Sequence, residues 1–274
     1  MNLKYLLIIL IAGKLSSQKI SGKILTEKKE PVSDARIGIS NEDIGGITDK
    51  DGNYSIDIST VESSKILKVV VNGYEPFQIK LSDFAALKNH SIFLKEKSMN
   101  IEEVHIIPKK YVAKNFGTKN SKRVYCGYNS EDVNKIFQEY AIKVRNNKKL
   151  KIKKINVELS SVALEKPALL IFDVQNSIND YPGTSVVNET LKLTISNENI
   201  QNNRISLDVS DKNIWLNEDF FISVRISEDF KGKMYFGGNI FAFSKSTYFR
   251  NYFGEWKKYS SGEPSINVDV LVEK

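Results

Sequence analysis

Histidine and cysteine are scarce in this sequence of 274 residues, which contains two histidines and one cysteine. A single cysteine cannot form an intramolecular disulfide, so the stability of the chain must come from its packed cores. A catalytic zinc site typically uses three protein ligands, such as His and Glu. His90 and His105 are too few for such a site, and neither begins a His-x-x-Glu motif. We therefore predict no metal site and no cofactor.

The common catalytic motifs are also missing. The chain has no Gly-x-Ser-x-Gly elbow, no phosphate-binding loop and no Gly-x-Gly-x-x-Gly fingerprint. Cys126 is expected to pack as a small apolar residue; the alternatives are a reactive thiol or a dyad with His105, which no motif supports. Adjacent acidic pairs such as Glu218-Asp219 point to opposite faces of a strand. The sequence therefore predicts no catalytic residues and a protein that is not an enzyme.

Long hydrophobic runs are absent apart from one at the N-terminus. Lys4 precedes the apolar stretch from Tyr5 to Gly13, and small residues follow at Ser16 and Ser17. An apolar run of about nine residues would span only roughly 14 Å as a helix, less than half a bilayer core of about 30 Å. We interpret residues 1–17 as a signal peptide, the alternative being a buried N-terminal strand or helix. The mature chain is then exported, without a transmembrane segment, to the periplasm, the outer membrane or the outside.

Positive charge is in excess, with a formal net charge of +7. Much of the excess lies in the run from Lys143 to Lys154. This run could contact anionic lipid, lipopolysaccharide or nucleic acid. We favour the alternative of a solvated turn leading into a strand with lysines on its outer face. Because export also argues against nucleic acid, we predict no nucleic-acid partner, and peripheral association with the outer membrane stays open.

Short alternating strands and turn residues fill residues 18–96. The markers are Ile20-Ser21-Gly22-Lys23-Ile24, Ala35-Arg36-Ile37-Gly38-Ile39, Asp51-Gly52-Asn53-Tyr54 and Gly73-Tyr74-Glu75. This spacing predicts a small antiparallel β-sandwich. The same string closely resembles the carboxypeptidase-regulatory-like domain, which is common in secreted and outer-membrane proteins of Bacteroidetes-type bacteria. The resemblance implies a transthyretin-like β-sandwich without catalytic machinery of its own.

Residues 97–110 are predicted to connect two domains. Within them, the segment from Ile101 to Ile107 resembles the Glu-Glu-Val segment that leads into the plug of TonB-dependent receptors. The alternative is a last β-strand or a strand between the domains. The residues that follow are too few for the many strands of a receptor barrel, so we expect that this chain is not itself a transporter.

Residues 111–274 are predicted to form a second, larger β-sandwich or jelly-roll-like domain with one short helix. Strand-like runs alternate here with loops rich in Asn, Asp, Pro and Gly. The helix is expected between Ser130 and Ile142, with Ser130 as its N-cap. This half resembles the uncharacterised C-terminal half of many flavobacterial proteins that carry the first domain, and that resemblance implies no assigned activity.

Aromatic residues crowd the segment after Met234. They are Tyr235, Phe236, Phe241, Phe243, Tyr248, Phe249, Tyr252, Phe253, Trp256 and Tyr259. Phe236, Phe241 and Phe243 flank a predicted hairpin turn and are expected in the core. Tyr248, Tyr252 and Trp256 lie among charged and polar residues in a loop-like stretch, and we predict that they bind a ligand. Core packing is the alternative for these three as well.

These patterns together predict an exported, non-catalytic envelope protein that binds a partner protein or a surface glycan. The N-terminal domain would be a spacer or docking module, and the second domain would carry the ligand site. Two alternatives stay open. One is a glycan-directed hydrolase whose carboxylates come together only in the folded second domain. The other is an accessory subunit of a TonB-dependent uptake system.

Overall fold

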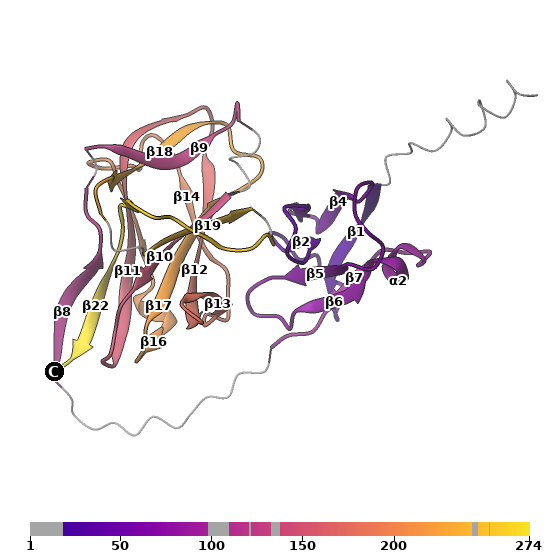
Figure 1. Ribbon diagram of the computed structural model, residues 1–274, viewed down its shortest axis with the longest axis horizontal. Coiled ribbons are helices and arrows are strands. Elements are labelled where there is room, and N and C mark those ends of the chain that lie inside the picture. The colour runs from indigo at the N-terminus through magenta and orange to yellow at the C-terminus, as the bar shows by residue number, and fades with distance from the viewer. Residues whose placement is uncertain (1–18, 98–109, 121, 133–137, 243–245, 252) are drawn as a thin grey trace, which may run out of the picture.

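A computed structural model describes residues 19–97, 110–120, 122–132, 138–242, 246–251 and 253–274. They form a small β-domain and a larger β-sandwich (Figure 1). The prediction of an all-β chain is confirmed. The predicted signal peptide, and the predicted connector apart from residues 97 and 110, lie outside the described residues. None of the helices in the described ranges is long and apolar enough to cross a membrane.

The small domain consists of two sheets packed around one core. The three-stranded sheet has the order β4 (Asn53–Asp57), β1 (Lys19–Thr26), β7 (Ile92–Leu94). The four-stranded sheet has the order β3 (Gly45–Ile47), β2 (Arg36–Ile39), β5 (Ile66–Val70), β6 (Phe77–Lys80). Every second residue enters the core, as with Tyr54 and Ile56 on β4 or Leu67 and Val69 on β5. Helix α2 (Leu81–Ala85) adds Leu81 and Phe84 to that core.

The larger domain begins with β8 and contains two sheets. The seven-stranded sheet has the order β13 (Tyr181–Ser185), β12 (Ala168–Ile178), β17 (Phe220–Ile226), β10 (Gln138–Val144), β19 (Thr247–Asn251), β20 (Lys257–Lys258), with β14 (Leu191–Ile195) also paired to β12. All of these pairs are antiparallel.

The eight-stranded sheet is built around the long strand β11 (Leu150–Leu164). Its order is β21 (Glu263–Pro264), β18 (Gly232–Asn239), β11, β22 (Ile266–Glu273), β8 (Tyr111–Gly117). The strands β15 (Arg204–Asp208) and β16 (Trp215–Leu216) pair with β11, and β9 (Val124–Asn129) pairs with β18. The 3-10 helix η1 (Ser210–Lys212) lies between β15 and β16 in the chain.

The core of the larger domain lies between its two sheets. Both sheets supply it with residues at alternate positions, such as Tyr140 and Ile142 from β10 and Ile155 and Val157 from β11. The side chain of Tyr128 crosses this core from the eight-stranded sheet, and its hydroxyl donates to the carbonyl oxygen of Val224 on the other sheet at 3.0 Å. A buried hydroxyl of this kind needs its partner, because an unpaired polar group in a core is costly.

Two details differ from the sequence-based predictions. The helix expected between Ser130 and Ile142 is wrong from Gln138 onward, where strand β10 begins. Tyr140, Ile142 and Val144 all point into the core, and this spacing of two residues is that of a strand and not of a helix. Residues 133–137 lie outside the described residues.

The core prediction for the hairpin aromatics is confirmed for Phe236 and wrong for Phe241, whose side chain is 64% exposed. Phe241 follows the end of β18, so it is not carried toward the core by the strand's alternation. Phe243 lies outside the described residues. The basic run forms the end of β10, a turn and the start of β11, as the solvated-turn interpretation expects.

We expect Tyr128→Phe to lower the free energy of unfolding by about 1 kcal/mol without changing the fold, because it removes one buried hydrogen bond. Urea denaturation measures this change. Tyr235→Phe is the matched control, because Tyr235 alternates with the core residues Met234 and Phe236 on β18 and is only half-buried. Equal losses in both variants would contradict the role given to the Tyr128 hydroxyl.

Candidate functional site

The outer face of the seven-stranded sheet is covered by the small domain. Figure 1 shows the four-stranded sheet of the small domain beside this face. The backbone amide of Asn41 donates to the carbonyl oxygen of Phe253 at 3.2 Å. Asp34 forms an ion pair with Lys192. The same face of the sheet carries Ala141, Phe221 and Tyr248, which form a buried cluster with Trp256 of the same domain packed against it.

A row of charged side chains crosses this covered face. Glu139 on β10 lies directly opposite Arg250 on β19. On the other side of β10, Tyr140 pairs with Val224, so Glu139 is in register with Arg225 on β17. Since Tyr140 and Val224 point into the core, alternation directs Glu139, Arg225 and Arg250 outward, toward the small domain.

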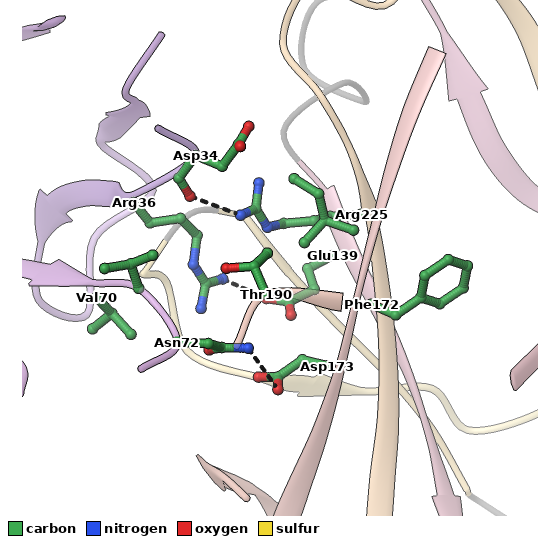
Figure 2. Close-up of a pocket in the computed structure, with 11 residues that line it drawn as sticks. Asp34, Arg36, Val70, Asn72, Glu139, Phe172, Asp173, Thr190 and Arg225 are labelled. Carbon is green, nitrogen blue, oxygen red and sulfur yellow. Dashed lines mark hydrogen bonds and ion pairs between the residues drawn. The ribbon is translucent and has the colours of Figure 1, made fainter. Parts of the chain in front are cut away.

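The small domain adds a third arginine to this row. On β2, Ile37 and Ile39 enter the core of the small domain, so Arg36 points away from that core. Its Nη1 donates to Glu139 Oε2 at 2.5 Å, as Figure 2 shows. The same oxygen accepts from Arg250 Nε at 2.9 Å and lies 2.8 Å from Arg250 Nη2. Oε1 of Glu139 accepts from the Ser223 hydroxyl at 2.7 Å.

The environment of Glu139 keeps this carboxyl ionised. Burial alone would raise its pKa, but the charges of Arg250 and Arg36 and the hydrogen bond from Ser223 outweigh burial and hold the pKa well below its usual range. On the cationic side, burial and the charge of Arg36 lower the pKa of Arg225 to about 10. One anion therefore joins both domains through three hydrogen-bonded partners.

A second polar contact between the domains lies at Asp173. Its Oδ1 accepts from Asn72 Nδ2 of the small domain at 3.3 Å (Figure 2) and from the Ser185 hydroxyl at 2.6 Å. Its Oδ2 accepts from Gln175 Nε2 at 3.0 Å. Burial raises the pKa of Asp173, and the hydrogen bonds from Ser185 and Gln175 oppose that shift only in part. Asp173 is thus a weaker anion than Glu139.

Beside these contacts, a cleft of about 330 Å³ opens between the two domains. Tyr74, Val71 and Phe253 supply apolar surface, and Arg36, Lys68 and Arg250 supply positive charge. Gln175 also lines the cleft; it is only 2% exposed, and its Oε1 accepts no hydrogen bond from the described part of the chain. This acceptor is available to a hydrogen-bond donor of a ligand.

A neighbouring cleft of about 390 Å³ shares Lys68, Arg250 and Phe253 with the first one and adds Tyr181 and Trp256. Burial, together with the charges of Arg250 and Arg36, lowers the pKa of Lys68. The first cleft is lined by four cations, Arg36, Lys68, Lys97 and Arg250, and by two carboxyl groups, Glu75 and Asp173, of which Asp173 is a weak anion. The neighbouring cleft adds the carboxyl group of Glu255. The electrostatic balance favours a ligand that carries negative charge.

The structure places the three residues predicted to bind a ligand as follows. Tyr248 is fully buried, and its hydroxyl donates to the carbonyl oxygen of Asp180 at 2.7 Å. Trp256 lines the neighbouring cleft, where the guanidinium carbon of Arg250 lies 4.2 Å from its ring centre. Tyr252 lies outside the described residues. Their role in binding stays a prediction.

Sequence reasoning missed the charged row. Arg36 and Glu139 are 103 residues apart in the chain, and nothing local connects them. One signal was available within the strands. Polar or charged residues alternate with apolar ones in Ile222-Ser223-Val224-Arg225-Ile226. That pattern marks a second face, although it does not say what covers it.

We expect Glu139→Ala to lower the free energy of unfolding by about 3–5 kcal/mol, because it leaves Arg36 and Arg250 without their buried partner. Chemical denaturation measures the loss. The control is Glu131→Ala, which removes an exposed ion pair with Lys233 and is expected to change stability very little. A similar loss of stability in both variants would show that the buried ion pairs of Glu139 contribute no more than the exposed ion pair of Glu131.

The contribution of Glu139 to stability should also depend on pH. Because its pKa is lower in the folded chain than the ordinary 4.5, its contribution is complete above pH 4.5 and is lost as the pH falls below that value. The stability difference between the unchanged protein and Glu139→Gln should therefore shrink on acidification, as measured by thermal unfolding at several pH values. The stability of the unchanged protein relative to Asp173→Asn should instead rise on acidification, because the raised pKa of Asp173 means that folding favours its protonated form. A difference for Glu139→Gln that is constant from pH 3 to 7 would contradict this assignment.

Comparison with known proteins gives one family match. The sequence model of the CarboxypepD_reg-like domain matches residues 20–106, less than half of the chain. No curated protein matches the chain.

Two of the solved structures are forms of BcpA, the major pilin subunit of Bacillus cereus. A variant is 10% identical with a TM-score of 0.20, and BcpA itself is 11% identical with a TM-score of 0.18; each alignment covers 90% of this chain and 68% of the other. A structure of infectious bursal disease virus, Gx strain, is 8% identical with a TM-score of 0.24, over 93% of this chain and 63% of the other. TM-scores this low do not indicate a shared fold, so the family match alone identifies residues 20–106 as a CarboxypepD_reg-like domain.

Proposed function

We propose that this chain is an exported, non-catalytic binding protein of the bacterial envelope. Its CarboxypepD_reg-like domain is a docking module held against the second domain, and the ligand occupies the cleft between them. The ligand is an anionic group presented by a partner protein or a surface glycan. The observation that carries this proposal is the cleft of about 330 Å³, with its surplus of cations and the unpaired acceptor of Gln175.

Close contacts support docking rather than free movement of the small domain. A Cβ atom at Gly73 would overlap the carbonyl oxygen of Asn188 in the second domain. One at Gly254 would overlap the carboxylate of Asp43 in the small domain. Together with the bonds at Glu139 and Asp173, these contacts give the cleft walls that are fixed before a ligand arrives. Preorganised walls reduce the entropy lost on binding.

The lining indicates a ligand with both a charged and an apolar part. Arg36, Lys68 and Arg250 suit a carboxylate or a similar anion. The rings of Tyr74 and Phe253 suit an apolar group or the apolar face of a sugar. Ligand sites often lie between domains and combine a largely apolar lining with a few polar groups. The predicted involvement of Trp256 fits this arrangement, because its ring lines the neighbouring cleft that shares Lys68 and Arg250.

The same cleft offers weaker support for a hydrolase. A glycosidase uses one carboxyl group as a proton donor and another as a base or nucleophile. Glu139 is bound by Arg36, Arg250 and Ser223, and its low pKa makes it a poor proton donor. Both oxygens of Asp173 already accept hydrogen bonds. The accessory role in a TonB-dependent system concerns residues 102–107, outside the described residues, and stays a prediction.

The proposal predicts that Lys68→Gln weakens binding about tenfold, because it removes a cation common to both clefts. Trp256→Ala should weaken it as well. The mature chain, beginning at Gln18, is screened against a glycan array with acidic and neutral members and against envelope proteins for capture. Titration of each hit with the variants then measures affinity.

Lys23→Gln is the matched control, because Lys23 lies on β1 and does not line either cleft. Hits that are acidic and weakened only by the cleft variants support the proposal. The absence of any acidic hit that Lys68→Gln or Trp256→Ala weakens overturns it. The array and the capture separate a glycan from a protein as the source of the anion.

A further inference from the structure

The outer face of the eight-stranded sheet lies on the side of the sandwich away from the small domain (Figure 1). On β11, Leu150, Ile152, Ile155 and Val157 point into the core. Alternation therefore turns Lys151 and Asn156 outward. A face that is not packed against another domain is expected to be polar. This face carries a hydrogen-bonded network of polar side chains and, in addition, a pair of exposed aromatic rings.

A fixed network of amides forms the floor of this face. Asn156 Nδ2 donates to Asn267 Oδ1 and to Asp269 Oδ2, both at 3.1 Å. Asn115 Nδ2 donates to Asn267 Oδ1 at 2.8 Å and to Asp269 Oδ1 at 2.7 Å. Asn156 and Asn267 are fully buried. The floor is therefore held in one arrangement by four strands, β8, β11, β15 and β22, since Ser206 also donates to Asn156 at 2.7 Å.

A shallow groove of about 660 Å³ lies over this floor. Its lining consists entirely of polar and charged residues, among them Lys154, Glu158, Gln201, Arg204 and Ser206. Arg204 Nη2 lies 3.7 Å from Asp269 Oδ2, and its buried Nε has no hydrogen-bond acceptor within the described ranges. The groove thus offers many donors and acceptors and no apolar centre of the kind that protein partners bury.

Two aromatic rings continue the face beyond the groove. The rings of Trp215 and Tyr111 lie 5.7 Å apart, and these residues are 41% and 37% exposed. Lys149 Nζ and Lys151 Nζ lie 5.4 and 5.7 Å from the centre of the Trp215 ring. Trp215 is opposite Lys151 on β11, and Asp208 is opposite Lys154. Three residues along a strand correspond to about 10 Å, so the rings and the groove can contact one extended ligand.

We propose that this face binds an acidic polysaccharide, a chain of sugars that carry carboxylates. Sugar rings stack their apolar faces on Trp215 and Tyr111, and the ammonium groups of Lys149 and Lys151 neutralise the carboxylates beside them. Sugar hydroxyls bond to the side chains of the groove, such as those of Lys154 and Gln201. The site is separate from the cleft between the domains.

The test is the affinity of the full mature chain for polygalacturonate, with dextran as the neutral polymer. Polygalacturonate should bind and dextran should not. The double variant Trp215→Ala, Tyr111→Ala should weaken binding about tenfold or more. The double variant Lys149→Gln, Lys151→Gln should weaken it about threefold and reduce its dependence on salt. The lysines are surface residues, so this second pair tests the site even if the aromatic pair impairs folding.

Phe241→Ala is the matched control, because Phe241 is also an exposed ring with a cation nearby, the guanidinium carbon of Arg123 at 5.2 Å. It should bind as the unchanged chain does. No binding of polygalacturonate, equal binding of dextran, or equal affinity of all variants overturns the proposal. Loss of polygalacturonate binding in Lys68→Gln alone also overturns it, since that result places the polymer in the cleft.

Discussion

The structure depends on one buried carboxylate, that of Glu139, held among arginines from two domains. Arg250 and Arg225 flank it on neighbouring strands, and Arg36 reaches it from the small domain. Buried ion pairs add little net stability compared with apolar packing, yet breaking one is costly. Such a pair favours the one placement of the small domain in which Arg36 meets Glu139, because any other placement leaves the buried carboxylate with one arginine fewer. That placement also sets the walls of the cleft, which include Arg36 from one domain and Gln175 from the other.

The two faces of the larger sandwich have different surroundings although both sheets share one core. Alternation gives each strand one apolar side for that core and leaves the other side free to vary. In the seven-stranded sheet the free side carries Glu139, Ser223 and Arg225 and is covered by the small domain. In the eight-stranded sheet the free side carries an amide network around Asn156 and Asn267 and faces away from it. The architecture therefore separates attachment from any binding on the open face.

The sequence predicted those parts of the fold that depend on near neighbours. Turn residues such as Gly52, together with alternation in β4 and β5, were enough for the small domain, and the family match supports it. The helix at residues 130–142 failed because Ile136, Tyr140 and their neighbours fit a helical face as well as a strand until the pairing partner is known. The charged row could not be predicted, since its members meet only after both domains have folded. For Trp256 the sequence indicated a polar neighbourhood, but the stacking on Arg250 depends on the sheet.

Covering one sheet with a second domain has a consequence for how the chain can be divided. The second domain produced alone would expose Phe253, which lies against Gly38 and Arg36 of the small domain. It would also leave Glu139 and Arg250 without Arg36 as a neighbour. Apolar surface that is exposed in this way promotes self-association. The small domain would lose less, because its own core is complete without the junction. Truncation is therefore asymmetric: the N-terminal domain keeps its whole core when expressed separately, whereas the larger domain loses the partner that its outer charged row contacts.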